Sequence, residues 1–338
     1  MSDNRYHRQQ VLIGQQGQKR LNDASVLLIG AGGIGSPLAL YLAAAGIGKL
    51  GIIDDDVVDL SNLQRQILFD MDDIGQSKAI RAQQKLQRLN NEIVIETFPQ
   101  RFDVNSAHQL IPGYDLMIDG SDNFPTRYCV NDFCALYQKP LISASVHQRQ
   151  GQVMFYNGQQ GCYRCLFPLP PLISFNCATA GVMGLTVGMT AMTAGTMAIN
   201  YFLTPDSAPM HQLLLIETQP IAIKTFSFEP NSQCQVCAQL NPLKEALNHR
   251  YRPIGIAPEE KALKNYQCID VRESHEDRKK TLSPDDIHLP LTTLAQNLDK
   301  LGDKPLLFYC AKGIRSHQTA FIMRDKGYDA YYYCGELR

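Results

Sequence analysis

The chain has 338 residues, of which 44% are hydrophobic and 19% charged, a composition typical of a globular protein with about two domains. This composition excludes a disordered chain, a collagen-like repeat and a small scaffold held together by disulfides. With 32 basic and 33 acidic side chains the formal charge is −1, which argues against a nucleic-acid partner.

The sequence also argues against export and against a membrane span. The first ten residues are polar and lack the apolar core of a signal peptide. The stretch from Cys165 to Pro205 carries no charge and is long enough to cross a membrane. Its Thr, Gly and Ala content, its prolines and the lack of flanking basic clusters favour a buried helix at a subunit interface. We therefore expect a cytoplasmic protein with no membrane partner.

Short apolar runs alternate with helical patterns in the first part of the chain. This alternation predicts an α/β fold with a Rossmann-like, doubly wound sheet. Apolar runs further along predict antiparallel strands. We expect helices at 5–21, 36–45 and 78–89, parallel strands at 25–29, 50–53, 93–97, 116–119 and 140–143, and later strands at 152–155, 213–217 and 223–228.

The character of the sequence changes at 246–262, where X-Pro pairs bracket a polar segment. We interpret this segment as a linker between a first domain at 1–245 and a small α/β domain at 263–338. Strands of the second domain are expected at 267–272 and 306–309.

A glycine-rich loop lies between the first parallel strand and its helix. Gly30, Gly32 and Gly35 give the spacing Gly-x-Gly-x-x-Gly. Glycines let the backbone approach a phosphate, and the helix N-terminus offers N–H groups to it. Asp54 ends the next strand, where an acid binds a ribose hydroxyl in dinucleotide-binding folds. Taken alone, these features fit an NAD-dependent oxidoreductase as well as other nucleotide-binding enzymes.

Further charged residues shift the interpretation toward a triphosphate. Arg65 and Lys78 add two cations, and Asp122 follows the strand at 116–119, where an open sheet binds its ligand. A dinucleotide needs little cationic clamping, whereas a triphosphate that loses pyrophosphate needs cations and a metal to hold the developing charge. Asp122 is suited to Mg²⁺, which binds one or two carboxylates together with phosphate oxygens.

Together these motifs resemble the MoeB/ThiF/HesA family, bacterial relatives of ubiquitin-activating enzymes, over about residues 5–240. The resemblance implies an adenylyltransferase that uses ATP and Mg²⁺ to activate the C-terminal glycine of a ubiquitin-like sulfur-carrier protein ending in Gly-Gly. Arg8 matches an arginine that reaches the ATP of the partner subunit, which implies a homodimer. By the same resemblance, the residues that contact ATP are Gly33, Asp54, Ser61, Asn62, Leu63, Gln64, Arg65, Lys78, Asp122 and Asn123.

Two Cys-x-x-Cys pairs, Cys162 with Cys165 and Cys234 with Cys237, predict a metal site. Four thiolates in this arrangement are typical of structural zinc with no open coordination position. Unligated cysteines or a redox pair are the alternative. The resembling family carries zinc at the matching positions, so we expect one Zn²⁺ that clips the adenylation domain.

Cys177 has two interpretations. It lies beside small residues at an expected helix start, where a thiol pKa can be lowered, and it also fits a buried core cysteine. Relatives have a cysteine in the same Cys-x-x-x-Gly-Val context. In some it forms a thioester or acyl disulfide with the carrier, and in others it is dispensable. A covalent role for Cys177 is therefore a hypothesis.

Cys310 lies between an expected strand and an expected helix. Loop N–H groups and the charge of Arg315 can stabilise a thiolate or persulfide there. The spacing Cys-x-x-Gly-x-Arg and the run Asp270–Glu273 resemble a rhodanese domain over about residues 265–335. The resemblance implies that Cys310 carries persulfide sulfur from a cysteine desulfurase or thiosulfate. A non-catalytic rhodanese is the alternative. Relatives continue with Gly-Gly and a further helix, so we expect the shorter C-terminus here to weaken this domain.

The combined prediction is an adenylyltransferase with sulfurtransferase activity, similar to the molybdopterin-synthase type. The carrier carboxylate attacks the α-phosphate of ATP, and persulfide sulfur then converts the acyl-adenylate to a thiocarboxylate for molybdopterin, thiamine or tRNA thiolation. A linker raises the effective concentration of Cys310 at the adenylating half. A non-catalytic carrier-binding scaffold and an NAD-dependent oxidoreductase remain as alternatives. The sequence leaves open the carrier, the pathway and the sulfur donor.

Overall fold

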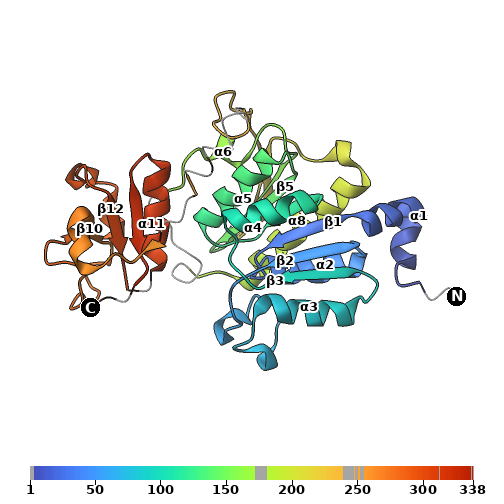
Figure 1. Ribbon diagram of the computed structural model, residues 1–338. Helices are drawn as coiled ribbons and strands as arrows, with labels where there is room; N and C mark the ends of the chain where they lie inside the picture. Colours follow the sequence, from blue (N-terminus) through green and yellow to red (C-terminus); the bar gives the residue numbers. More distant parts are fainter. Residues whose placement is uncertain are drawn as a thin grey trace. The chain divides into compact units, whose positions relative to one another are not determined.

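The computed structural model describes residues 4–171, 181–238, 247, 250–251, 255–311, 313–335 and 337 (Figure 1). The chain divides into two compact units. The first consists of Met1–Asp122, Thr126–Leu166 and Asn176–Lys244, and the second of Asn123–Pro125, Phe167–Phe175 and Glu245–Arg338.

The first unit contains an eight-stranded sheet in the order β3-β2-β1-β4-β5-β6-β7-β8. The first five strands are parallel and the last three antiparallel, so the predicted doubly wound sheet with later antiparallel strands is confirmed. The strands are β1 (Ser25–Ile29), β2 (Lys49–Ile53), β3 (Val94–Phe98), β4 (Leu116–Asp119), β5 (Leu141–His147), β6 (Gln150–Tyr156), β7 (Gln212–Thr218) and β8 (Ile221–Ser227).

Helices connect and cover these strands. The sequence predicted the first three helices but missed α4 and α5. The helices are α1 (His7–Asp23), α2 (Gly35–Ala45), α3 (Lys78–Leu89), α4 (Val104–Leu110), α5 (Phe124–Leu136), α6 (Tyr163–Leu166) and α8 (Gly184–Leu203), with 3-10 turns η1 (Leu60–Asn62), η2 (Met71–Asp73), η3 (Ile111–Gly113) and η4 (Pro205–Ser207).

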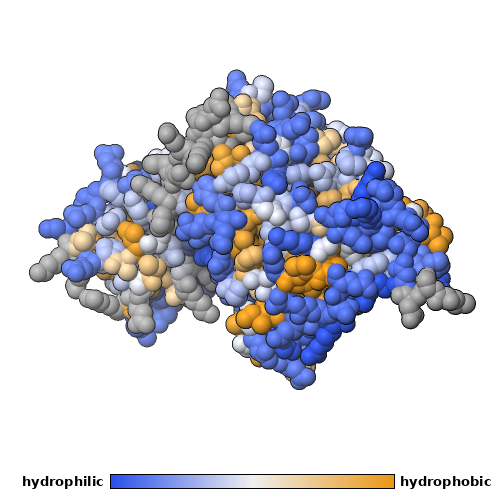
Figure 2. Space-filling view, turned by 45° about the vertical axis from the view of Figure 1, so that its right-hand side comes forward, coloured by the Kyte–Doolittle hydropathy of each residue, from blue (hydrophilic) through white to orange (hydrophobic). Residues whose placement is uncertain are grey.

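The long charge-free segment forms α8, which packs on α2 and on strands β5 and β6. Its Thr and Ala side chains on the packed face, among them Thr190 and Ala194, are fully buried. Within the described residues, no helix has both the length and the apolar character that a membrane span requires. Hydrophobic side chains are nevertheless exposed in patches (Figure 2). The most exposed of the described large hydrophobic side chains are Leu12 at 87%, Leu185 at 80%, and Val11 and Ile221 at 77% each.

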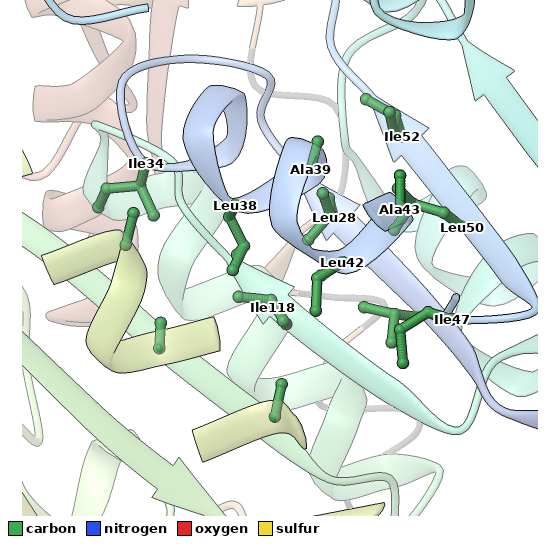
Figure 3. Close-up of a cluster of buried hydrophobic side chains, with 14 of the residues drawn as sticks. Leu28, Ile34, Leu38, Ala39, Leu42, Ala43, Ile47, Leu50, Ile52 and Ile118 are labelled. Carbon is green, nitrogen blue, oxygen red and sulfur yellow. The ribbon is translucent and has the colours of Figure 1, made fainter. Parts of the chain in front are cut away.

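The core of the first unit lies between the sheet and the helices α2 and α8. Leu38 and Leu42 of α2 lie beside Ile118 of β4, and Leu28 of β1 belongs to the same cluster (Figure 3). Burying one such side chain stabilises the fold by about 1.5–3 kcal/mol. This packing fixes α2 against the sheet, and with it the glycine loop that precedes α2.

The second unit contains a parallel five-stranded sheet in the order β11-β10-β12-β13-β9. Its core packs Phe308 and Ile269 of the sheet against Ala320 and Met323 of α11. The two predicted strands are present, although the first ends earlier, at Asp270. The elements are β9 (Gly255–Ile256), η5 (Glu260–Asn265), β10 (Gln267–Asp270), β11 (Ile287–His288), α10 (Leu291–Leu294), η6 (Leu298–Lys300), β12 (Leu306–Tyr309), α11 (Ile314–Asp325) and β13 (Ala330–Tyr333).

Candidate functional site

The strand order places a ligand crevice at the carboxyl ends of β1 and β4. From β1 the sheet runs to β2 and β3 on one side and to β4 and β5 on the other. Open α/β sheets bind their ligands at such a switch point. The glycine loop follows β1, and the loop with Asp122 follows β4, so the two predicted motifs flank one crevice.

Glycines shape the turn from β1 into α2. Gly30 has a φ of +94°, and a Cβ there would lie 3.4 Å from the carbonyl oxygen of Gly120. A Cβ on Gly35 would lie 1.9 Å from the carbonyl oxygen of Gly30, a distance that no side chain can occupy. The loop therefore needs glycine at these positions, and it delivers the N-terminus of α2 to the crevice.

Asp54 follows β2 and holds the glycine loop. Its carboxylate accepts hydrogen bonds from the backbone N–H of Ala31, at 2.7 Å, and of Asp56, at 2.8 Å. Burial raises the pKa of Asp54 above its ordinary value, and the charge of Lys78 opposes that rise. Each oxygen retains a second lone pair, which can accept a hydrogen bond from a ribose hydroxyl.

Lys78 begins α3 and is only 5% exposed. Its Nζ lies 2.9 Å from Oδ2 of Asp56, an acid with a largely exposed side chain. Its backbone N–H also donates to the carbonyl oxygen of Asp56, at 3.0 Å. The exposed carboxylate of Asp56 thus holds the Lys78 ammonium in place. The same ammonium is close enough to Asp54 for its charge to oppose the rise in the pKa of that carboxyl.

The turn η1 sets the position of Arg65. Asp59 caps this turn, because its carboxylate accepts from the N–H of Ser61 and its own N–H donates to Oδ1 of Asn62. The Arg65 guanidinium in turn donates to the carbonyl oxygen of Ser61, at 3.0 Å. The side chain of Asn62 therefore shapes the loop in addition to its predicted role.

Arg65 and Gln64 reach across to the glycine loop and to α8. A Cβ on Gly33 would lie 3.5 Å from Cγ and Cδ of Arg65 and 2.9 Å from Val187. A Cβ on Gly184 would lie 2.6 Å from the carbonyl oxygen of Gln64. Leu63 is half-buried and packs against the main core. The structure thus brings Gly33 and Arg65 together.

The loop that carries Asp122 is shaped by a buried ion pair that the sequence analysis missed. Asp119, at the end of β4, accepts from the N–H of Ser121 and pairs with Nε of Arg127, at 3.3 Å. Arg127 also donates to the carbonyl oxygen of Ser121, at 2.7 Å. Asp122 is exposed at the tip of this loop, and Asn123 follows it in the chain.

Arg8 is exposed on α1, far from the glycine loop of its own chain. Gln9 donates to the carbonyl oxygen of Ala45, so this part of α1 lies at the C-terminal end of α2. The glycine loop lies at the other end of this 11-residue helix, about 16 Å away. Arg8 is therefore not placed to bind nucleotide in its own chain. Cys177 lies outside the described residues.

The four predicted zinc ligands converge. Their sulfur atoms all lie within 4.8 Å of one another. The distance is 3.7 Å between Cys162 and Cys234 and 3.4 Å between Cys165 and Cys237. Tetrahedral zinc with bonds of about 2.3 Å requires sulfur separations of about 3.8 Å, so the cluster fits zinc.

Buried polar contacts fasten the first Cys-x-x-Cys turn to α5. Nε of Arg164 lies 2.7 and 3.0 Å from the two carboxylate oxygens of Asp132, and its guanidinium stacks 4.4 Å over the ring of Tyr128. The N–H of Tyr163 donates to Oδ1 of Asn131, at 2.7 Å. The sequence gave no signal for these pairs because their members lie 32 residues apart.

Cys310 lies at the carboxyl end of β12, in the second unit, and is 5% exposed. The backbone N–H of Ser316 points at its sulfur, at 3.5 Å, and the Ser316 hydroxyl lies 3.4 Å away. Gly313, with a φ of +75°, turns the chain into α11. The sulfur therefore lies between a strand and the N-terminus of α11, as the sequence predicts.

The charge of Arg315 is neutralised, which the sequence did not predict. Nη1 and Nη2 of Arg315 donate to the two carboxylate oxygens of Glu276, at 2.5 and 2.6 Å. Glu276 also accepts from the N–H of Glu273, and the hydrogen bond with Arg315 lowers its pKa to about 2. Arg315 thus gives the loop less positive potential than an unpaired arginine would.

The Asp270–Glu273 run forms a second buried network in this unit. Asp270 is fully buried and pairs with Arg272, at 2.8 and 2.9 Å, and with Arg278, at 2.9 Å. Arg272 also donates to the carbonyl oxygens of Asp277 and Lys280. These contacts tie the segment after β10 into one fixed loop.

Comparison with known proteins gives a consistent picture for the first unit. The model of the ThiF family matches residues 6–236. The chain is 39% identical over 255 residues to a sulfur carrier protein adenylyltransferase from Thermus thermophilus, which covers 72% of this chain and 94% of the relative. It is 41% identical over 251 residues to an adenylyltransferase and sulfurtransferase MOCS3 from Anopheles gambiae, covering 72% of this chain and 57% of that relative.

A solved structure shares the fold. The crystal structure of E. coli MccB with selenomethionine MccA has a TM-score of 0.63 at 25% sequence identity, and the match covers 71% of this chain and 75% of that chain. The family match ends before the second unit begins its sheet.

Proposed function

Because the chain belongs to the ThiF family, we propose a reaction in two stages that starts from sulfur-carrier adenylation. In the first stage the C-terminal carboxylate of a ubiquitin-like carrier attacks the α-phosphate of ATP and pyrophosphate leaves. In the second stage sulfur from a Cys310 persulfide displaces AMP, which leads to a carrier thiocarboxylate.

The observation that carries the first stage is the pair of cations beside the glycine loop. Arg65 lies beside Gly33, within reach of a Cβ placed there, and Lys78 is held beside Asp56 in the segment after β2. Cations in these positions stabilise the charge that develops on the phosphates as pyrophosphate departs. Asp54 holds the loop and accepts the ribose hydroxyl.

The remaining motif residues would complete the nucleotide site. Ser61, Asn62, Leu63 and Gln64 form the turn that positions Arg65, and Asn123 lies beside Asp122 in the chain. The exposed carboxylate of Asp122 suits Mg²⁺, which neutralises phosphate charge when it is bound.

We extend the proposal to a homodimer in which Arg8 acts on the partner's nucleotide. Arg8 is exposed near the end of α2 opposite its own glycine loop, and the exposed hydrophobic side chains Val11 and Leu12 lie on the same helix. In an equal mixture of Arg8→Ala and Lys78→Met chains, each mixed dimer has one intact site. About a quarter of the wild-type activity should therefore return.

The four-cysteine cluster would hold one structural Zn²⁺, which joins the segment after β6 to the segment after β8. All four positions are filled by protein sulfur, so the metal takes no part in the reaction.

The sulfur stage would belong to a rhodanese-like domain at 263–338, joined through the linker 246–262 to the adenylation domain at 1–245. Cys310 at the N-terminus of α11 supports this assignment. Cys177 is a further candidate for covalent contact with the carrier. Molybdopterin, thiamine and tRNA thiolation are the pathways that such a thiocarboxylate could serve.

The test is ATP–pyrophosphate exchange with Mg²⁺ and a panel of purified carriers that end in Gly-Gly. Exchange with one carrier would establish adenylation and name the partner. Carrier binding without exchange would point to a scaffold, and nicotinamide binding to an oxidoreductase. A Cys310→Ser chain should still catalyse exchange but form no thiocarboxylate from thiosulfate or a desulfurase. Normal output from that variant would refute the sulfur stage.

A further inference from the structure

Two cysteines end neighbouring strands of the second unit. Strands β12 and β13 are parallel, and their last register pair is Phe308 with Tyr332. Continuing this register by two residues places Cys310 opposite Cys334. The chain still follows the sheet at Cys334, because its N–H donates to the carbonyl oxygen of Ile256 in β9, at 3.1 Å.

The two cysteines also belong to the same face of the sheet. Phe308 and Cys310 lie in one core cluster, and Tyr332 packs against that cluster. Because side chains alternate along a strand, Cys334, two residues after Tyr332, belongs to this face as well. Neighbouring strands lie about 4.8 Å apart, and disulfides join Cα atoms that are about 4.4–6.8 Å apart. The register therefore suits a bond between Cys310 and Cys334.

The two thiols differ in their exposure to solvent. Cys310 is 5% exposed and receives the N–H of Ser316, whereas Cys334 is exposed. The Cys310 sulfur is thus buried beside a backbone N–H that can bind a persulfide, and the Cys334 sulfur is accessible to a reductant from solution. The other described cysteine of this unit, Cys268, packs in a different cluster with Leu307.

The proposed sulfur stage needs a second thiol. When the persulfide of Cys310 displaces AMP, the carrier is left as an acyl disulfide on Cys310. Release of the thiocarboxylate requires two electrons to break that sulfur–sulfur bond. We propose that Cys334 is the resolving cysteine of this step, an inference that rests on the proposed function.

The step balances without an oxidant. The Cys334 thiolate attacks Sγ of Cys310, and the bond between Cys310 and the outer sulfur breaks. The outer sulfur leaves with the carrier as a thiocarboxylate anion, and a Cys310–Cys334 disulfide forms. The Cys334 sulfur is oxidised from thiolate to disulfide, the outer sulfur is reduced to the thiocarboxylate, and the oxidation state of the Cys310 sulfur does not change. A dithiol reductant then returns the disulfide to two thiols, by exchange at the exposed Cys334.

The main experiment follows one turnover of the full zinc-loaded chain with carrier, ATP and thiosulfate as the sulfur donor, and with no added thiol. Wild-type protein should release thiocarboxylate and show a Cys310–Cys334 linked peptide by non-reducing mass spectrometry. Cys334→Ser should release at least about tenfold less and retain the carrier as an acyl disulfide, because no thiol is held near the bond. Dithiothreitol should restore release. Cys268→Ala is the matched control and should behave as wild type.

Other outcomes separate this inference from the proposed function. Full release by Cys334→Ser without thiol, or a link from Cys310 to another cysteine such as Cys177, would overturn the role of Cys334. Absence of pyrophosphate exchange would instead refute adenylation.

A second measurement needs neither carrier nor ATP. Protein loaded with inorganic polysulfide and desalted should release hydrosulfide as Cys334 attacks the Cys310 persulfide, and should gain the same linked peptide. If neither polysulfide nor diamide links these two cysteines in the wild type, the pairing is wrong.

Discussion

Loss of the four-cysteine cluster should strongly destabilise the first unit while leaving the second unit folded. Cys162 and Cys234 are 72 residues apart in the sequence. A covalent link that closes a loop of this length contributes about 4 kcal/mol in the chain-entropy treatment, and we apply the same treatment to the metal link. For a unit of this size, that free energy corresponds to a fall in Tm of about 10 °C.

The test substitutes Cys234→Ser, which removes one ligand from the cluster. Zinc is counted by plasma mass spectrometry, and unfolding is followed by calorimetry. Cys134→Ala is the matched control, since Cys134 is also buried in the first unit but lies outside the cluster. We expect one zinc per chain in the wild type and the control, and less than one in Cys234→Ser with the large fall in Tm.

Two results would refute this reasoning. If pure wild-type protein contains no zinc and all ten of its cysteine thiols react after denaturation, the cysteines of the cluster are unligated. If Cys234→Ser loses the metal but unfolds at the same temperature as Cys134→Ala, the metal link adds no stability.

Three further predictions concern single side chains. Lys78→Met should lower pyrophosphate exchange by about 10²–10³-fold with little change in Tm, because its partner faces water; Lys19→Met, from an exposed ion pair, should leave both unchanged. Asp132→Ala should cost about 3–5 kcal/mol in denaturant unfolding, because it removes a carboxylate from a buried guanidinium; a cost below about 1 kcal/mol would contradict this. The lowered pKa of Glu276, about 2 against an ordinary 4.5, stabilises the fold above pH 4.5, and this stability is lost as the pH falls toward 2. The free energy of unfolding of the wild type should exceed that of Glu276→Gln by about 1 kcal/mol at pH 7. The urea midpoints of the two proteins should converge as the pH falls from 4.5 toward 2.

The sequence predicted the strands well where an apolar run ends in a turn signal. Strand β1 has the predicted bounds Ser25–Ile29, and α3 the predicted bounds Lys78–Leu89. Helix α5 was missed because two polar residues, Asn131 and Asp132, lie on its buried face and interrupt the apolar periodicity. Their partners come from the segment around α6, and no local pattern could reveal that.

In the candidate site, too, contacts between residues far apart in the sequence could not be predicted. Motif spacing predicted the glycine loop and the cysteine cluster, because local turns and ligand pairs determine them. It did not predict the Asp119–Arg127 pair that shapes the loop of Asp122, or the neutralisation of Arg315 by Glu276, 39 residues away. Charge in a site is set by partners that the fold brings together, so sequence alone overestimated the positive potential at Cys310.

The candidate sites of the two units share a backbone arrangement but differ in how their cationic side chains are paired. In each, a parallel strand ends at a glycine-containing loop and a helix N-terminus follows, at α2 in the first unit and at α11 in the second. In the first unit, Lys78 pairs with an acid that is exposed to water, so in the proposed function salt should weaken the attraction of this site for phosphates. In the second, Arg315 is held by Glu276, and the Cys310 sulfur has its polar contacts with the N–H and the hydroxyl of Ser316. Increasing ionic strength should therefore weaken ATP binding more than it weakens persulfide formation at Cys310.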